Sequence, residues 1–340
     1  MNKATSAGRG LALGILLAAG LAGCAGAPAA PASPAPAAAQ GRIFVTNQES
    51  NDMTVLDAAT NAVLTTVPTG QAPHDVSTAP DGQEVWVAYY QENHVAVFDP
   101  ATLQPIGQVE LGGKSDEFAF APDGKRLYVT MGQANQVAVI DPAARTLLKV
   151  SVGETPHGIA VRPDGQEVYV TNTRANTISI LSLAGAPARA RTFRVGADPF
   201  QVTFDAAGRR AYISEFLGDA VTVVDTAGRK TTGTLRAGKN PAGLRFVPGP
   251  APGAAAQSLL WVPCAASQEV WVLAAAADKL VARVPTGGGP HDVVATPAGK
   301  VFVTNTNDNT VTVIDAATRQ PLATVSVGRS PYNLTFVAAP

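Results

Sequence analysis

Residues 42–340 repeat one pattern seven times, and this periodicity constrains the fold more than any single residue does. Each unit has a valine-rich segment, a second segment that ends near Asp, a third rich in Thr and Gly, and a fourth that follows a Pro-containing loop. Successive units begin 42, 42, 41, 43, 49 and 41 residues apart. The opening strings are RIFVTN from Arg42, EVWVAY from Glu84, RLYVTM from Arg126, EVYVTN from Glu167, RAYISE from Arg210, LLWVPC from Leu259 and KVFVTN from Lys300.

Each unit is predicted to form four β-strands. Residues 168–170 and 178–180 show the period-two alternation of half-buried strands. Pro-Asp-Gly turns at 80–82, 122–124 and 163–165 fix φ at Pro and allow positive φ at Gly. All-β repeats of about 40 residues are typical of propellers. The sequence therefore predicts an all-β, seven-bladed β-propeller of four-stranded blades.

The register of the repeat also predicts how the ring closes. The repeat region opens on a second strand, residues 43–47, and ends on a first strand, residues 332–337. The C-terminal strand is therefore expected to complete the N-terminal blade, which removes open sheet edges and joins the two ends. The alternative is an open solenoid with capping repeats. Because neither end carries a polar cap, the closed ring is favoured.

The strings YVTN at 169–172 and FVTN at 44–47 and 302–305 resemble the YVTN-repeat family of β-propellers. The resemblance extends over all seven units and implies the propeller fold. That family includes periplasmic and cell-surface binding proteins. Similar propellers serve as haem-binding or quinoprotein-associated subunits, lactonases and streptogramin lyases. The resemblance therefore implies a fold without selecting a function.

The N-terminal residues read as a targeting segment. Lys3 and Arg9 precede an apolar run over 11–21, which is too short to span a bilayer. The following Leu-Ala-Gly-Cys resembles a bacterial lipobox, which implies that residues 1–23 are a lipoprotein signal peptide and that Cys24 is lipidated; an ordinary signal peptide is the alternative. In such lipoproteins Ala25 implies anchoring to the outer membrane, and we expect a periplasmic protein.

Composition divides the mature chain further. Residues 24–41 are almost all Ala and Pro, which predicts an extended tether before the propeller at 42–340.

The formal net charge of −1 argues against nucleic-acid binding, which needs many phosphate contacts. Charge is uneven, since 42–123 hold 12 acids and 2 bases whereas 186–245 hold 10 bases and 5 acids. We expect a monomer whose membrane contact is made only through the lipid.

Candidate site residues lie in two adjacent columns of the repeat, at the entrance to the first strand of each unit. Three of the four histidines share one column, and the fourth, His94, lies in the loop QENH. The predicted ring places all four on one face, at a mouth of the central channel. The first column is His74, Asp116, His157, Phe200, Ala242, His291 and Tyr332, and the second is Asp75, Glu117, Gly158, Gln201, Gly243, Asp292 and Asn333.

Three interpretations of this mouth stay open. The histidines can be structural, hydrogen-bonding loop backbone. They can line a pocket for an anionic or aromatic ligand. They can also bind a divalent metal such as Zn, Ni, Cu or Mn through His74, His94, Glu92 and Asp116, although no metal-binding spacing is present. The ligand-binding set of the second interpretation is His74, Asp75, Asp116, Glu117, His157, Phe200, His291, Asp292 and Tyr332.

The sequence contains no catalytic signature of the G-x-S-x-G, H-E-x-x-H or C-x-x-C-H type. It therefore favours a binding or scaffolding module that contacts a small molecule or a protein through the channel mouth. The alternative is a metal-assisted lactonase or lyase at the same mouth. No cofactor is predicted apart from a divalent metal.

Overall fold

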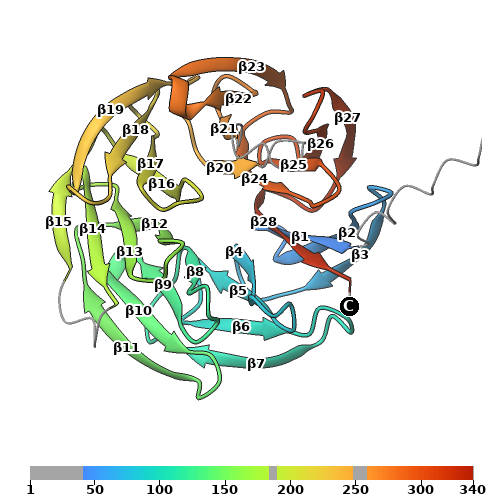
Figure 1. Ribbon diagram of the computed structural model, residues 1–340. Helices are drawn as coiled ribbons and strands as arrows, with labels where there is room; N and C mark the ends of the chain where they lie inside the picture. The colour runs from blue at the N-terminus through green and yellow to red at the C-terminus, as the bar shows by residue number, and fades with distance from the viewer. Residues whose placement is uncertain (1–40, 184–189, 248–258, 340) are drawn as a thin grey trace, which may run out of the picture. The chain divides into compact units, whose positions relative to one another are not determined.

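The computed structural model describes residues 41–183, 190–247 and 259–339, which form a β-propeller of seven four-stranded antiparallel blades (Figure 1). The predicted fold class is confirmed. Two 3₁₀ turns, η1 (Gly132–Ala134) and η2 (Ala275–Ala277), complete the described elements. From the innermost strand outward the blades are β28 (Pro331–Ala338), β1 (Gly41–Asn47), β2 (Asp52–Asp57) and β3 (Val63–Pro68); β4 (Pro73–Thr78), β5 (Val85–Tyr89), β6 (His94–Phe98) and β7 (Pro105–Glu110); β8 (Phe118–Phe120), β9 (Leu127–Met131), β10 (Gln136–Asp141) and β11 (Thr146–Ser151); β12 (Pro156–Val161), β13 (Glu167–Asn172), β14 (Thr177–Ser182) and β15 (Arg191–Arg194); β16 (Pro199–Phe204), β17 (Arg210–Glu215), β18 (Ala220–Asp225) and β19 (Lys230–Arg236); β20 (Arg245–Val247), β21 (Leu259–Cys264), β22 (Glu269–Ala274) and β23 (Lys279–Pro285); β24 (Pro290–Ala295), β25 (Lys300–Asn305), β26 (Thr310–Asp315) and β27 (Pro321–Ser326).

The two ends of the propeller close the ring by pairing with each other. β28 lies antiparallel to β1, with Ile43 opposite Phe336 and Phe44 opposite Thr335. The last strand is therefore the innermost strand of the first blade, as the repeat register predicted. Breaking this closure requires losing a full ladder of backbone hydrogen bonds between residues almost 300 positions apart, so the join couples both ends to one cooperative structure.

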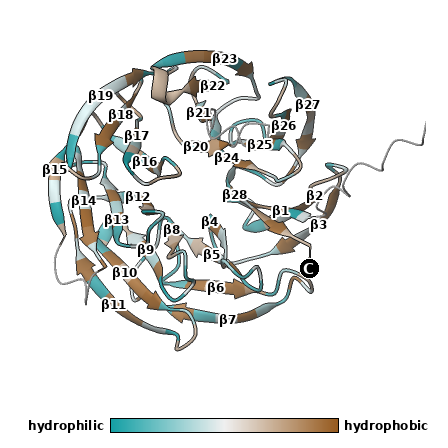
Figure 2. Cartoon of the chain, viewed as in Figure 1, coloured by the Kyte–Doolittle hydropathy of each residue, from teal (hydrophilic) through white to brown (hydrophobic). Residues whose placement is uncertain are grey.

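The core lies between the blades, where apolar faces of neighbouring sheets pack together. Trp86 of one blade shares a cluster with Met131 of the next, and Tyr212 shares one with Trp271. Figure 2 shows that middle strands such as β10 and β14 are largely apolar, whereas the outermost strand β15 is largely hydrophilic.

Cys264 is a buried free thiol, and burial raises its pKa to about 12, which makes it an unreactive core residue at neutral pH.

A polar contact at the start of the second strand links several neighbouring blades. Glu84, directly before β5, accepts a hydrogen bond from Arg145 of the next blade at 2.8 Å, and Glu167 of β13 pairs with Arg229 of the following blade. At the equivalent position Lys300 donates to the carbonyl oxygen of Ala58, across the junction next to the ring closure. The opening residues Glu84, Glu167 and Lys300 therefore contribute to packing between neighbouring blades.

The predicted targeting residues 1–23 and the lipidation site Cys24 lie outside the described residues. Of the predicted tether, only Gly41 is described, and it already belongs to β1. Within the described ranges, no helix is long and apolar enough to cross a membrane.

Candidate functional site

The innermost strands begin with a proline followed by a bulge. In β12 the pairing with β13 shifts between Pro156 and Ile159, so one extra residue is accommodated there. The same irregularity occurs at the start of β4, β16, β24 and β28. Because a bulge re-aims the side chains that it contains, two successive residues of each strand are presented toward the channel instead of one. These are the residues of the two sequence columns.

A hydroxyl at the threonine position of the V-T-N string holds the bulges of β12, β16, β24 and β28 in place, whereas β5 has Ala88 at this position beside the bulge of β4. The hydroxyl of Thr171 accepts a hydrogen bond from the backbone N–H of Gly158 at 2.8 Å and donates to the carbonyl oxygen of Phe200, in the next blade, at 2.8 Å. The signature residue therefore fixes the channel residues of two blades at once. Equivalent donations join Thr46 to His74, Thr130 to His157, Ser214 to Ala242 and Thr304 to Tyr332, at 3.0, 2.7, 2.6 and 2.8 Å.

Five rings of the first column form a closed circuit that we call the aromatic layer: His74, His157, Phe200, His291 and Tyr332. Rings at this spacing are in direct contact and favour tilted or edge-to-face arrangements. Two further rings contact this layer, since Tyr90 stacks on His74 and Phe216 packs in a tilted arrangement against Phe200. The centroid distances around the circuit are 5.8 Å from His74 to His157, 4.0 Å from His157 to Phe200, 5.6 Å from Phe200 to His291, 3.7 Å from His291 to Tyr332 and 4.1 Å from Tyr332 to His74.

The imidazoles of this layer are neutral at physiological pH. Burial holds the pKa of His74 well below its ordinary value, and it lowers the pKa of His157 to about 4 and that of His291 to about 3. The Nδ1 of His74 lies 3.0 Å from the carbonyl oxygen of Asp116. A carbonyl only accepts hydrogen bonds, so Nδ1 of the neutral ring carries the proton and Nε2 presents a lone pair.

The second column forms a carboxyl layer made of Asp75, Glu117 and Asp292, with the amides of Gln201 and Asn333. Asp75 accepts hydrogen bonds from Asn333 Nδ2 at 2.7 Å and from the backbone N–H of Phe118 at 2.8 Å. Gln201 donates from Nε2 to a carboxyl oxygen of Glu117. These contacts cross between blades, so polar side chains of the layer link neighbouring innermost strands.

Burial disfavours the charged form of every carboxyl group in this network. It raises the pKa of Asp75 to about 6 and raises that of Glu117 well above its ordinary range, where the charge of Asp75 adds to the effect. Burial also raises the pKa of Asp292, which the cation of Arg245 partly offsets. Glu117 lies 3.5 Å from Nδ1 of His157. Because burial favours a protonated carboxyl and a neutral ring, this contact is not an ion pair.

A cavity of about 320 Å³ lies directly beside the carboxyl layer, and the innermost strands of all seven blades contribute to its lining. Asp75, Glu117 and Asp292 face it with Gln201 and Asn333, whereas none of the five rings of the aromatic layer lines it. Arg245 supplies the only basic group in the lining. The channel is therefore a polar pocket with the packed aromatic layer at one end.

A family model for the choice-of-anchor I domain matches residues 38–241, which is more than half of the chain. The chain belongs to the choice-of-anchor I domain family. No curated protein sequence matches it significantly.

Solved structures similar to this choice-of-anchor I domain protein are also propellers of low sequence identity. The periplasmic gluconolactonase PpgL of Pseudomonas aeruginosa is 22% identical, with a TM-score of 0.71 over 88% of this chain and all of that one. Hydrazine synthase of Kuenenia stuttgartiensis is 22% identical (TM-score 0.69, covering 80% of this chain and 91% of that one). AztD of Citrobacter koseri is 12% identical (TM-score 0.65, covering 88% and 98%). At these identities the likeness establishes the shared fold.

The structure divides the nine ligand-binding residues predicted from sequence between two levels. His74, His157, Phe200, His291 and Tyr332 form the aromatic layer, and Asp75, Glu117 and Asp292 form the carboxyl layer. Asp116 belongs to neither lining, because its carboxylate accepts a hydrogen bond from Gly132 N at 2.7 Å.

The predicted metal-binding residues are not gathered in this family member. His94 lies 3.3 Å from Glu92, and its ring packs against Tyr89, away from the aromatic circuit that contains His74. Across the described ranges, no three His, Cys, Asp or Glu side chains are grouped so that they could hold a metal ion. The metal-binding set stays a prediction.

Sequence reasoning had not selected Gln201, Asn333 or Arg245 as site residues. Gln201 and Asn333 stand in the second column and could have been found there. Arg245 is harder to recognise, because the equivalent positions in other blades hold small residues such as Ser77 and Ala160. The signal that could have identified Arg245 is a single long cation at a repeat position where other blades have small side chains.

Proposed function

We propose that this protein binds a small, polar, hydroxyl- or amine-bearing ligand in its channel. The observation that carries this proposal is the 320 Å³ cavity lined by three buried carboxyl groups and two amides, opposed by one guanidinium. Concave sites with a few converging polar groups are the usual form of small-molecule sites in proteins. The YVTN-like repeats supply a rigid frame for them, which fits a binding module.

The charge of the lining selects the chemical class of ligand. Asp75, Glu117 and Asp292 offer acceptor oxygens, and in their protonated forms they also donate. A neutral polyol or an amine can hydrogen-bond to these carboxyl groups, whereas an anion is repelled by those that are ionised. These residues therefore favour a neutral or cationic ligand over the anionic ligand considered from the sequence, and none of the rings of the aromatic layer lines the cavity to receive an aromatic one.

The test is a thermal-shift and calorimetric screen of the purified mature protein with D-glucitol and D-glucosamine, combined with native mass spectrometry for a ligand retained through purification. A binding compound should raise the melting temperature of the wild type, and Asp292→Asn should weaken its affinity roughly tenfold. Glu154→Gln, an exposed carboxylate outside the channel, is the matched control. An affinity unaffected by Asp292→Asn would place the ligand elsewhere.

A second candidate function is hydrolysis of a sugar lactone at the same cavity. Asp75, with a pKa of about 6, is mostly ionised at neutral pH, whereas burial and the charge of Asp75 raise the pKa of Glu117 well above its ordinary value. Carboxyl groups whose pKa values are driven apart can share acid and base roles. The fold shared with a gluconolactonase suggests D-glucono-1,5-lactone as the first substrate. Asp75→Asn should lower its hydrolysis by about 10²–10⁴-fold. A wild-type rate equal to that of buffer removes this candidate.

We also propose that the protein is a periplasmic lipoprotein held at the outer membrane through Cys24, from which the channel could serve a small molecule or a scaffolded partner. The lipobox-like string supports this proposal. Cys24→Ser should release the protein into the soluble periplasmic fraction or leave it unprocessed. Unchanged fractionation with the outer membrane would contradict acylation at this residue.

A further inference from the structure

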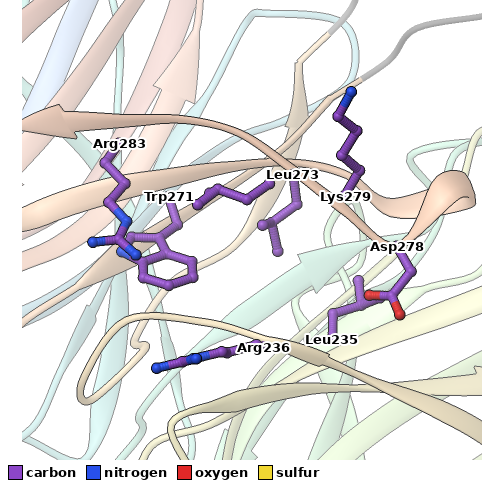
Figure 3. A pocket seen from close by; sticks show the side chains of 8 residues that line it. Leu235, Arg236, Trp271, Leu273, Asp278, Lys279 and Arg283 are labelled. Carbon is purple, nitrogen blue, oxygen red and sulfur yellow. The ribbon is translucent and has the colours of Figure 1, made fainter.

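A groove of about 260 Å³ lies on the outer rim of the propeller, between the outermost strands of two neighbouring blades, β19 and β23 (Figure 3). Leu235, Trp271 and Leu273 form an apolar floor and are buried. Arg236 and Arg283 are exposed at its edge. The groove thus combines an apolar floor with a basic rim, far in the fold from the innermost strands that line the channel.

The charge at the rim is positive. Arg236, Lys279 and Arg283 contribute three cations, and Asp278 is the one acidic residue of the lining. None of the three cations belongs to any ion pair found among the described residues. Arg236 also belongs to the basic part of the sequence, 186–245, which holds 10 bases and 5 acids.

A comparison of two Arg–Trp pairs shows what is unusual here. Arg145 lies 4.7 Å from the ring centroid of Trp86 and also donates to Glu84, so its charge is paired. Arg283 lies 4.4 Å from the centroid of Trp271, with which it is directly paired across β22 and β23. In both pairs the indole Nε1 also donates to the nearby carboxylate, Trp86 to Glu84 at 2.9 Å and Trp271 to Glu269 at 2.6 Å. The difference is that, among the described residues, no ion pair joins Arg283 to Glu269.

The stacked guanidinium of Arg283 is therefore held in a defined position with its charge unneutralised by a neighbouring carboxylate. Stacking on an indole orients an arginine and leaves the in-plane N–H groups directed outward. These donors match a carboxylate in the two-bond geometry that arginine favours. The floor beneath can receive an apolar side chain next to it.

We propose that this groove docks an extended acidic segment of a partner protein, with a carboxylate on Arg283 and an apolar side chain on the Leu235–Trp271–Leu273 floor. Charge complementarity favours an acidic occupant. The shape of the site favours an extended peptide, because β23 is the last strand of its sheet and pairs only with β22. Its free edge can accept backbone hydrogen bonds from an added strand whose alternate side chains reach the groove.

The experiment uses the mature protein and the peptide Glu-Glu-Leu-Phe-Glu-Glu-amide, labelled with fluorescein at its N-terminus for anisotropy and acetylated there for tryptophan emission. Trp271 lies in the groove, whereas Trp86 and Trp261 are fully buried elsewhere, so docking should change the emission of Trp271 alone. Arg283→Glu should raise the Kd at least about tenfold, because it replaces a charge-assisted contact by repulsion. Arg283→Gln, which removes the positive charge without reversing it, should give an intermediate loss.

Lys230→Glu is the matched control, since Lys230 is an exposed cation of the same strand β19 that does not line the groove. It should change the Kd less than about twofold. The proposal is overturned if the peptide with Gln in place of Glu binds equally, or if Arg283→Glu binds like the wild type while retaining the wild-type circular dichroism spectrum. It is also overturned if phosphatidylglycerol vesicles or inorganic phosphate, and not the peptide, bind at this groove.

Discussion

The aromatic layer and the carboxyl layer differ by a single position in each repeat, yet they behave as opposite kinds of structure. His157 and its neighbours contact one another as a closed circuit, whereas Glu117 and its neighbours face a cavity. Both depend on the same bulges and the same threonine hydroxyls. The comparison teaches that one repeated backbone device can present a packing surface and a polar binding surface side by side.

The largest effect is expected where the backbone of both layers is tightest. A Cβ added at Gly158 would lie 2.3 Å from the carbonyl oxygen of Phe200, a backbone atom that cannot move aside cheaply. Gly158→Ala should therefore lower the free energy of unfolding by about 3 kcal/mol through overpacking. Gly233→Ala is the matched control, because nothing lies within 4 Å of its added methyl group. Urea denaturation monitored by circular dichroism measures both, and equal stabilities would contradict the close approach.

Removing one hydroxyl should be the next largest effect, because it loosens both layers together. Thr171→Val keeps the shape of the side chain but leaves the N–H of Gly158 and the carbonyl of Phe200 without their partner. We expect a loss of about 2 kcal/mol in the free energy of unfolding, the usual cost of buried polar groups left unpaired. Thr234→Val, at an exposed position of β19, should change stability by less than about 0.5 kcal/mol. A loss of the same size in both variants would show that the hydroxyl has no special role.

The third prediction uses the opposite titration of the two layers. His291, with a folded pKa of about 3 and an ordinary value of 6.5, takes up its proton only in the unfolded chain between these pH values. Stability due to His291 therefore falls as the pH drops from 6.5. Asp75 has a folded pKa of about 6 and an ordinary value of 3.8, so between these pH values the folded protein binds the proton and the unfolded chain does not. The stability due to Asp75 therefore increases as the pH drops from 6 to 3.8.

Variants of the two residues should tilt the pH profile in opposite directions. His291→Gln should make the protein less sensitive to acid between pH 6.5 and 4.5, and Asp75→Asn should make it more sensitive. Each proton bound differently in the two states changes the slope by about 1.4 kcal/mol per pH unit. The measurement is urea denaturation at half-unit pH steps. If both variants shift the slope in the same direction, the assignment of the layers to opposite titration is wrong.

The sequence predicted some features of the fold and of the channel, and it missed others. The strands, the ring and its closure by β28 followed from the period of the repeat and from the alternation within it, because these depend on local patterns. The columns containing His157 and Glu117 were found in the same way. Their separation into two layers was not, since it depends on a bulge that only strand pairing reveals. The role of Arg245 was missed because it departs from the repeat instead of following it.

The smallest effect is expected where an imidazole of the aromatic layer is replaced by an aromatic ring without nitrogens. His291 is 91% buried and 3.7 Å from Tyr332, but its Nδ1 has no hydrogen-bond partner among the described residues, so its nitrogen contributes desolvation cost without a matching bond. His291→Phe should therefore change the free energy of unfolding at pH 7 by less than about 1 kcal/mol. His74→Phe, which breaks the contact with the carbonyl of Asp116, should cost more. If the two substitutions reversed this order at matched pH, the aromatic layer would owe its stability to polar contacts instead of ring packing, and its contrast with the carboxyl layer would disappear.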